Sequence, residues 1–233
     1  MISRSNALAC ETCPVRDRAA CSALSNSERE ELAAIGRHRT LKAGEILFHA
    51  GDPNDQCATL ISGALKIRSS DSEGVERILS LIHPAGFVGE LFAPVAHHDV
   101  VALAESDVCL FPATRYEQVV ERFPALGRAL LRRSSEDLLA AHALIGLMGR
   151  RTALQKVAGF IKAMADAASS SPCHPAERFD LPMTRGDMAG MLGLTIETVS
   201  RQIGRLEKDG VIEREGPRGI RLKDPARLAG IES

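Results

Sequence analysis

Residues 183–201 read MTRGDMAGMLGLTIETVSR and predict two short helices joined by a tight turn. Thr184, with Asp187 three positions later, is typical of a helix start. Gly193 follows the first apolar segment, where a turn between helices requires a residue that tolerates positive φ. Thr195 can then cap the second helix.

The second helix is expected to begin at Ile196 and to end at Gly210. Its apolar residues recur every three or four positions and are expected to face inward: Ile196, Val199, Ile203 and Leu206. Residues 211–222 contain two short apolar segments around Gly216-Pro217-Arg218-Gly219 and predict a hairpin. Together these elements predict a winged helix-turn-helix.

In a docked helix-turn-helix, the first turns of the second helix reach the base edges of the DNA. The outward residues there are Glu197, Thr198, Ser200, Arg201 and Arg205. Glutamate can accept from cytosine N4, and arginine can pair with guanine O6 and N7. Glu197 and Arg201 could instead form a surface salt bridge, since they are four residues apart. The cap, the turn glycine and the hairpin agree, so double-stranded DNA is the favoured partner. We include Arg185 and Thr195 among the DNA-contacting residues.

Charge is distributed unevenly around this unit. Residues 1–149 carry a net charge of −4 and residues 150–223 a net charge of +4, within a total of −1. A basic C-terminal part behind an acidic N-terminal part suits a polyanionic partner. Aromatic residues make up only 3%, which argues against a stacking platform for single-stranded nucleic acid.

Upstream of this unit, residues 39–112 contain short β-branched and apolar segments separated by turn residues. The expected strands lie near residues 45–48, 58–61, 65–68, 77–82, 100–103 and 108–111. Many short strands with glycine turns predict an antiparallel β-roll of the jelly-roll type. A short helix is expected over residues 27–36, with Ser27 and Glu30 as its capping box.

A long helix is expected from Pro124 to Met148, since no other proline interrupts this stretch. A heptad seam follows its length: Leu131, Ser134, Leu138, Ala141, Ile145 and Met148. An ordinary core helix is the simpler interpretation, but the position between a β-roll and a DNA-binding unit favours a dimer interface. A further helix is expected over residues 152–165.

The fold class is therefore α+β, and four parts are expected. Residues 1–26 form a cysteine-rich arm, 27–122 the β-roll, 123–150 the dimerisation helix and 151–233 the winged helix-turn-helix. No apolar stretch has the length of a membrane span or of a signal-peptide core, so we expect a cytoplasmic protein with no membrane partner.

Three cysteines are clustered in the arm. Cys10, Cys13 and Cys21 have the spacing C-x2-C-x7-C, and clustered thiolates can bind one metal centre. A fourth ligand would come from Cys57, Cys109 or Cys173. Four thiolates suit either zinc or an iron–sulfur cluster.

The segments around Thr184, Gly193 and Thr198 to Arg201 resemble the helix-turn-helix of the CRP/FNR superfamily, specifically its FNR branch. The β-roll and the long helix fit the same family. The resemblance implies a homodimeric transcription activator, not an enzyme, that reads a TTGAT-like palindrome through Glu197, Ser200 and Arg201 and works with RNA polymerase.

The resemblance also implies a sensor of oxygen, nitric oxide or redox state that controls anaerobic or microaerobic genes. Its cofactor would be a [4Fe-4S] cluster on Cys10, Cys13, Cys21 and Cys109, with Cys57 and Cys173 left structural. FNR-like switches rely partly on an acidic residue in the dimer helix. The seam here has Ala141, and no Asp or Glu lies between Asp137 and Asp166, so the metal-free protein should dimerise more readily.

Four alternatives compete with this interpretation. Gly89-Glu90-Leu91 resembles the start of a cyclic-nucleotide cassette, but no Lys or Arg occurs from Ile78 to Thr114 to neutralise a phosphate. A haem sensor using His97 or His98 would leave the arm cysteines unused. An enzyme built on His97-His98-Asp99 lacks a nucleophile–base pair. A metal-free thiol switch among the arm cysteines is the fourth alternative.

Overall fold

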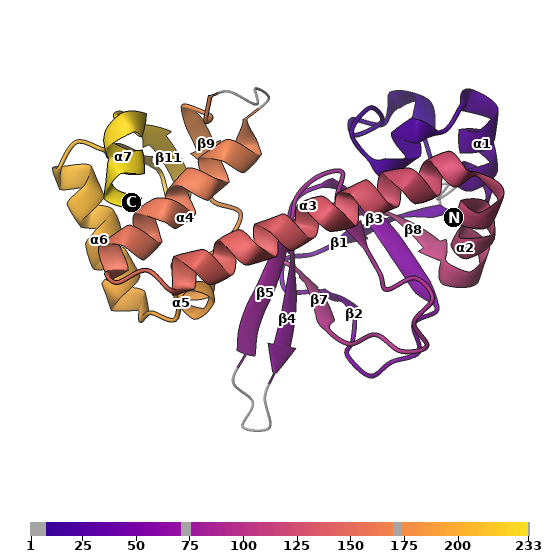
Figure 1. The fold of residues 1–233 in the computed structure, drawn as a ribbon, viewed down its shortest axis with the longest axis horizontal. Coiled ribbons are helices and arrows are strands. Elements are labelled where there is room, and N and C mark those ends of the chain that lie inside the picture. The colour runs from indigo at the N-terminus through magenta and orange to yellow at the C-terminus, as the bar shows by residue number, and fades with distance from the viewer. Residues whose placement is uncertain (1–7, 71–75, 170–173, 233) are drawn as a thin grey trace, which may run out of the picture. The chain divides into compact units, whose positions relative to one another are not determined.

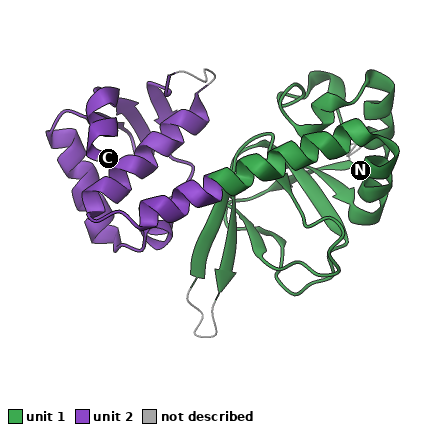
Figure 2. Cartoon of the chain, in the orientation of Figure 1, with its two compact units in different colours: residues 1–139 green, residues 140–233 purple. Residues whose placement is uncertain are grey.

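The computed structural model describes residues 8–70, 76–169 and 174–232. They form two compact units, residues 1–139 and residues 140–233, and the division falls inside one long helix (Figures 1 and 2). The helices are α1 (Asn26–Ile35), α2 (Ala113–Arg122), α3 (Pro124–Met148), α4 (Ala153–Ala168), α5 (Arg185–Leu192), α6 (Ile196–Lys208) and α7 (Pro225–Glu232). Two 3-10 turns, η1 (Cys10–Thr12) and η2 (Ala20–Ala23), precede α1.

The first unit contains two antiparallel four-stranded sheets, which confirms the predicted β-roll. One sheet has the order β1-β8-β3-β6 and the other β2-β7-β4-β5. Their strands are β1 (Arg37–Leu41), β2 (Ile46–Phe48), β3 (Gln56–Ser62), β4 (Leu65–Ser70), β5 (Glu76–Ile82), β6 (Phe87–Val88), β7 (Asp99–Ala102) and β8 (Ser106–Pro112). The six predicted strands are present, whereas β1 and β6 were not predicted.

The main core of the roll draws on both sheets, with Leu60 and Val108 from one and Leu65 and Val100 from the other. A second core includes Phe111 of β8 together with Leu24, Leu32 of α1 and Leu126 of α3. The first turn of α3 therefore shares a core with the end of the cysteine-rich arm.

Helix α1 begins one residue earlier than predicted, and its N-cap lies two residues earlier. Ser25 is its N-cap: the Ser25 side chain accepts from the Glu28 N–H, and the Glu28 carboxylate accepts from the Ser25 N–H at 2.7 Å. Both Ser25 and Ser27 have a glutamate three residues later, so the sequence pattern fits either start. The earlier start leaves Leu24 just before the helix, where it is buried.

Helices α2 and α3 follow the roll, and α3 has the predicted extent. None of the described helices combines the length and the apolar character that crossing a membrane requires.

The second unit contains α4 to α7 and a three-stranded sheet of order β10-β11-β9. Its strands are β9 (Arg178–Asp180), β10 (Ile212–Glu215) and β11 (Gly219–Leu222). Helices α5 and α6 pack on each other and α6 packs on α4, as expected for a helix-turn-helix supported by a further helix. The hairpin β10-β11 is the predicted wing, while β9 and α7 were not predicted.

Candidate functional sites

The four cysteines that were assigned to a metal centre line one cavity of about 30 Å³ in the first unit. Cys10 lies on η1, Cys13 just after it, and Cys21 on η2, so three belong to the arm. Cys109 lies on β8, far away in the sequence. Leu32, Thr59 and Phe111 also line the cavity. The structure thus brings together the clustered cysteines and the distal one.

Strand alternation explains why Cys109 faces the arm. Val108 and Leu110 point into the core between the two sheets. Cys109 and Phe111 therefore point to the other face of the sheet, since side chains alternate along a strand. Thr59, the register partner of Cys109 on β3, lines the same cavity.

The thiols of this cavity are held largely away from water. Burial, followed by the proximity of the arm cysteines, raises the pKa of Cys109 to about 12. Burial followed by the proximity of Cys13 raises the pKa of Cys10 and of Cys21, whereas Arg29 lowers both. Cys10, Cys21 and Cys109 are therefore protonated at neutral pH until a cation compensates the charge of their thiolates.

The donor set of the cavity fits a metal–thiolate centre. Among the described residues, no three His, Cys, Asp or Glu side chains are close enough together to hold a single ion. A zinc ion binds four ligands at about 2.3 Å from one point, whereas a four-iron cluster binds each thiolate at a separate iron. The four thiols that line the cavity match the ligand type and number of a four-iron cluster.

The two remaining cysteines are not part of this arrangement. Cys57, on β3, is buried in the second core and is not among the residues lining the cavity. Burial, followed by the proximity of Glu117, raises its pKa to about 12. Cys173 is outside the described residues.

In the second unit, the helix-turn-helix has the predicted local geometry. Thr184 is the N-cap of α5 and forms a capping box with Asp187. Gly193 ends α5 in the left-handed region, at φ 62° and ψ 43°. The Thr195 side chain caps α6 by accepting from the Thr198 N–H at 3.2 Å.

The predicted base-reading residues lie on α6. Glu197, Arg201 and Arg205 are exposed, and Thr198 and Ser200 are partly exposed. Glu197 and Arg201 do not form the salt bridge considered above among the described contacts. Arg201 donates instead to Thr198 Oγ1 at 3.4 Å, and Arg205 lies 3.8 Å from Asp209. Hydrogen bonds with its own N–H and with Thr195 lower the pKa of Glu197, which is therefore an anionic acceptor at neutral pH.

Ile196 differs from the expectation. Val199, Ile203 and Leu206 are buried, but the Ile196 side chain is 52% exposed. The residue is the first of α6, so it lies beyond the layer packed on the other helices. An exposed apolar side chain at this end can contact the methyl group of thymine. Its position directly after the cap, rather than its spacing, would have indicated this exposure.

Two contacts connect α6 to its neighbours. Arg185 of α5 donates to Ser200 Oγ at 3.2 Å, which orients two predicted DNA contacts together. Glu207 of α6 accepts from the Arg214 backbone N–H at 3.2 Å and from Arg214 Nε at 2.7 Å. The wing is thereby fixed to the reading helix.

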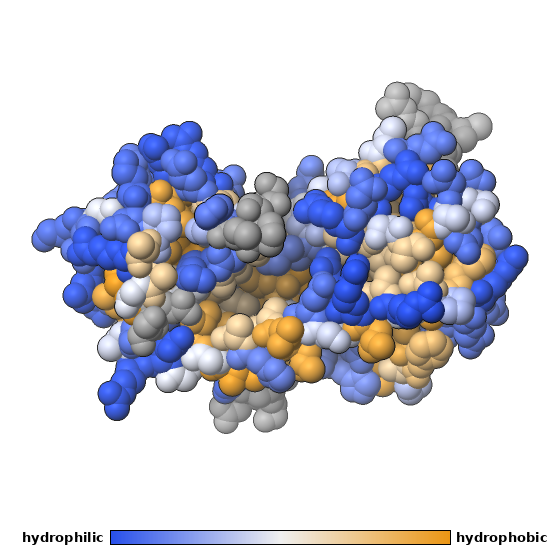
Figure 3. Space-filling model, turned by 45° about the horizontal axis from the view of Figure 1, so that its top comes forward, coloured by the Kyte–Doolittle hydropathy of each residue, from blue (hydrophilic) through white to orange (hydrophobic). Residues whose placement is uncertain are grey.

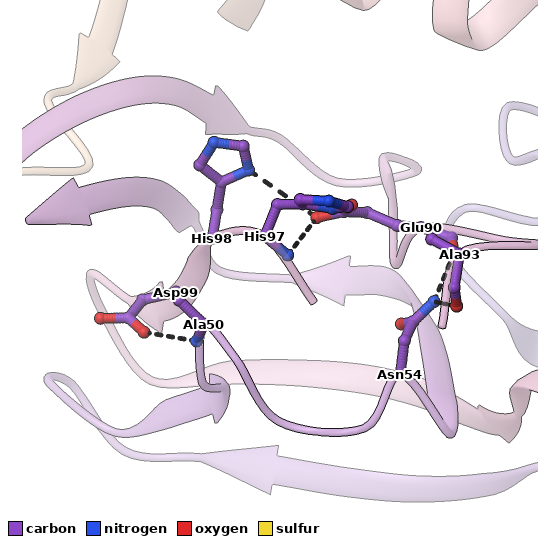
Figure 4. Close-up of polar contacts among 7 residues, drawn as sticks. All are labelled: Ala50, Asn54, Glu90, Ala93, His97, His98 and Asp99. Carbon is purple, nitrogen blue, oxygen red and sulfur yellow. Dashed lines mark hydrogen bonds and ion pairs between the residues drawn. The ribbon is translucent and has the colours of Figure 1, made fainter. Parts of the chain in front are cut away.

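The loop that resembled a cyclic-nucleotide cassette uses its acidic residue internally (Figure 4). Glu90 accepts from the His97 N–H at 2.9 Å and also pairs with the His97 ring. His98 Nδ1 lies 3.7 Å from Glu90 Oε1, the oxygen that accepts from the His97 N–H. Asn54 donates to the backbone oxygens of Glu90 and Ala93. Glu90 thus has two histidine partners within its own loop.

The predicted dimer seam lies on exposed parts of α3. Leu131, Leu138, Ile145 and Met148 are 69%, 57%, 60% and 44% exposed, while Ala141 is half-buried. Large apolar side chains exposed at helical spacing are typical of an interaction surface. Figure 3 colours each residue by its hydropathy, and hydrophobic residues (orange) reach the surface on the face that it shows.

Two sequence models of known families match the chain. The Crp-like helix-turn-helix domain matches residues 155–231, and the cyclic nucleotide-binding domain matches residues 38–123.

Curated relatives match nearly the whole chain. The transcriptional activator protein FnrL of Cereibacter sphaeroides is 35% identical over 226 residues, which covers 94% of this chain and 90% of the relative. The nitrogen fixation regulation protein FixK of Bradyrhizobium diazoefficiens is 30% identical and covers 95% and 93%. Among solved structures, FixK2 from Bradyrhizobium japonicum has a TM-score of 0.76 at 25% identity, covering 85% of this chain and 98% of that one.

Proposed function

Because the chain belongs to the Crp/Fnr family of DNA-binding transcription regulators, and not to an enzyme family, we propose that it is an oxygen- or redox-responsive activator controlled by a [4Fe-4S] cluster. One observation carries the proposal: Cys10, Cys13, Cys21 and Cys109 line a single cavity although Cys109 is distant in the sequence. When bound, the cluster supplies iron that reacts with oxygen or nitric oxide.

The four thiols would connect the arm to the sheet. Three belong to the arm and one to β8, so holding one group in common fixes the arm against the roll. Cys21 and Cys109 also pack against the second core, which contains Leu126 and Leu130 of α3. A change at the cavity can therefore reach the start of the dimer helix through packed side chains.

The seam on α3 is the surface on which we propose that two copies meet. Its exposed apolar residues are Leu131, Leu138, Ile145 and Met148, with Ala141 between them. A two-fold dimer would present two α6 helices to successive half-sites of a palindrome. RNA polymerase is the further partner expected of an activator.

The proposed DNA site is TTGAT-like in each half. Glu197 and Arg201 supply the acceptor and the donor for a cytosine and a guanine, and Ile196 adds an apolar contact for thymine. Arg185 begins α5 and Thr195 caps α6. We propose that both contact phosphates of the DNA backbone, because helix N-termini favour anions.

Purification without oxygen tests the proposal. Iron, sulfide and zinc per chain, the visible spectrum and binding to a TTGAT palindrome are measured before and after exposure to air. About four iron and four sulfide per chain are expected, with the absorbance lost and the DNA affinity reduced in air. Zinc without iron, or no metal, would contradict the cluster and leave the DNA-binding assignment intact.

A further inference from the structure

The described lining of the cysteine cavity is positively charged. Of its described lining residues, the basic ones are Arg16 and Arg29, and none is Asp or Glu. Arg29 is only 8% exposed, and Arg16 is partly buried. A buried guanidinium without a counter-ion is costly, and arginine is almost never fully buried unless it is paired.

The contacts of Arg29 are all with neutral oxygens. Its Nε donates to the Cys21 carbonyl at 3.2 Å, its Nη2 to the Leu24 carbonyl at 3.0 Å, and its Nη1 lies 3.5 Å from Asn26 Oδ1. These contacts orient the guanidinium and satisfy donors, but they do not cancel its charge.

Arg16 is held in a similar way. Its Nη2 donates to the same Asn26 Oδ1 at 2.9 Å, and its Nη1 to the Glu11 carbonyl at 3.3 Å. Neither arginine has a carboxylate partner within ion-pair distance among the described residues. One neutral amide oxygen thus holds two cations beside the thiols.

The cavity offers one kind of anion that could balance them. Four thiolates around a [4Fe-4S] core of charge +2 carry a net charge of about −2, and four thiolates drawn closer together around one zinc ion carry the same charge. We propose that Arg29, assisted by Arg16, is a counter-ion positioned for an anionic metal–thiolate centre on the four cysteines. This inference rests on the metal-binding part of the proposed function, but not on iron as the metal.

A cation beside the centre has two consequences. It favours thiolates over thiols, so metal binds more tightly. It also favours the more reduced and more negative form of an iron–sulfur cluster, because nearby charge sets the reduction potential. Removing the cation should weaken metal binding and make a loaded cluster easier to oxidise.

Zinc affinity of the oxygen-free, metal-free full-length protein tests this inference, by competition with a chelating dye. The variants are Arg29→Gln, which keeps donors and removes charge, and Arg29→Lys, which keeps charge. Arg18→Gln is the matched control, because Arg18 is an exposed arm residue that does not line the cavity. We expect Arg29→Gln to bind zinc about tenfold more weakly, Arg29→Lys to recover most of that loss, and the control to be unchanged.

Iron–sulfur loading gives the second measurement. In air, the cluster absorbance of Arg29→Gln should decay several-fold faster than that of the wild type or of Arg29→Lys. Circular dichroism of the metal-free proteins checks folding. If Arg29→Gln does not fold, Arg16→Gln should show a smaller loss in the same direction.

Each outcome has a definite meaning. Unchanged zinc affinity and unchanged decay in Arg29→Gln would overturn the inference. Equal losses in Arg29→Gln and Arg29→Lys would also overturn it, because hydrogen bonding rather than charge would then be the role of Arg29. If the wild type binds zinc in an Arg29-dependent way but cannot be loaded with iron and sulfide, the cluster function fails and the inference stands. A wild type that binds neither metal contradicts both.

Discussion

The DNA-reading unit and the cysteine cavity are assembled from the sequence in different ways. The helix-turn-helix is one continuous segment, α5 to α6, whose caps and turn glycine bond to residues three or four positions away. The cavity joins the arm and α1 to Thr59 and Cys109 on two strands. Local chemistry is enough to specify the first site, whereas the second exists only once the β-roll has folded. Substitutions should therefore affect the two sites very differently.

The largest expected effect comes from removing the distal cysteine. Cys109→Ala should abolish stable cluster loading, because it takes away the one thiol that connects the arm to the sheet. Iron and sulfide per chain after reconstitution measure the loss. Cys57→Ala is the control: it also removes a buried thiol from the sheet, but outside the cavity lining. Equal iron contents in the two variants would exclude Cys109 as a ligand.

A charge in the dimer seam should have the next largest effect. Leu138→Glu replaces an exposed apolar residue, so the protomer should fold while the dimer is lost. Affinity for a palindrome should fall by about a hundredfold or more. In the dimer, each α3 would lose the apolar contact of Leu138, and the two new glutamates would repel each other. Sedimentation velocity and mobility shifts measure these changes. Ala140→Glu, exposed on another face of α3, should remain dimeric.

Much of the fold could be predicted from the sequence. The strands β2, β3, β4, β5, β7 and β8 have apolar or β-branched residues and end at turn residues. Strand β1 has the burial pattern of an outer strand, with Leu41 as its one buried residue, and β6 has only two residues, so neither has a clear apolar pattern. The capping box was assigned to Ser27 because two overlapping serine–glutamate pairs fit the same rule.

The sites divide in the same way. Thr184, Gly193 and Thr195 have the predicted roles, because each role depends on a neighbour in the sequence. The charge environment of the cysteines could not be predicted. Arg29 is one more basic residue on a helix in the sequence, and only the folded arm shows it buried beside the thiols.

Within the helix-turn-helix, a base contact from α6 and a phosphate contact from α5 should be separable. Arg201→Ala should weaken binding by about 1–3 kcal/mol and relax the preference for guanine at one position. Arg185→Ala should weaken binding about equally for all DNA sequences. It should also reduce the slope of log affinity against log salt concentration by about one. Mobility shifts on single-base variants at several salt concentrations distinguish the two. An Arg201 variant that keeps its full preference would remove Arg201 from the base-reading residues.

A smaller effect is expected at Ala141. An aspartate there would place one negative charge from each protomer close together in the dimer. Their repulsion should cost about 1 kcal/mol of dimerisation free energy in a hydrated seam. Ala141→Asp should therefore shift the metal-free protein toward monomer, measured by sedimentation equilibrium. Ala143→Asp, exposed on another face of α3, is the control. A metal-free wild type that is already fully monomeric at micromolar concentration would contradict the idea that an absent acidic brake favours association.

The smallest effects test whether local chemistry alone shapes the helix-turn-helix. Gly193 has φ 62°, and a Cβ added there would meet no atom within 4 Å, so Gly193→Ala should cost about 1–2 kcal/mol of unfolding free energy through backbone strain alone. Gly190, inside α5, has the same open space but no positive φ. Gly190→Ala should therefore stabilise by about 0.5–1 kcal/mol. Denaturant unfolding followed by circular dichroism measures both. Changes of the same sign would mean that packing with the rest of the unit, rather than the turn itself, sets the geometry of the reading helix.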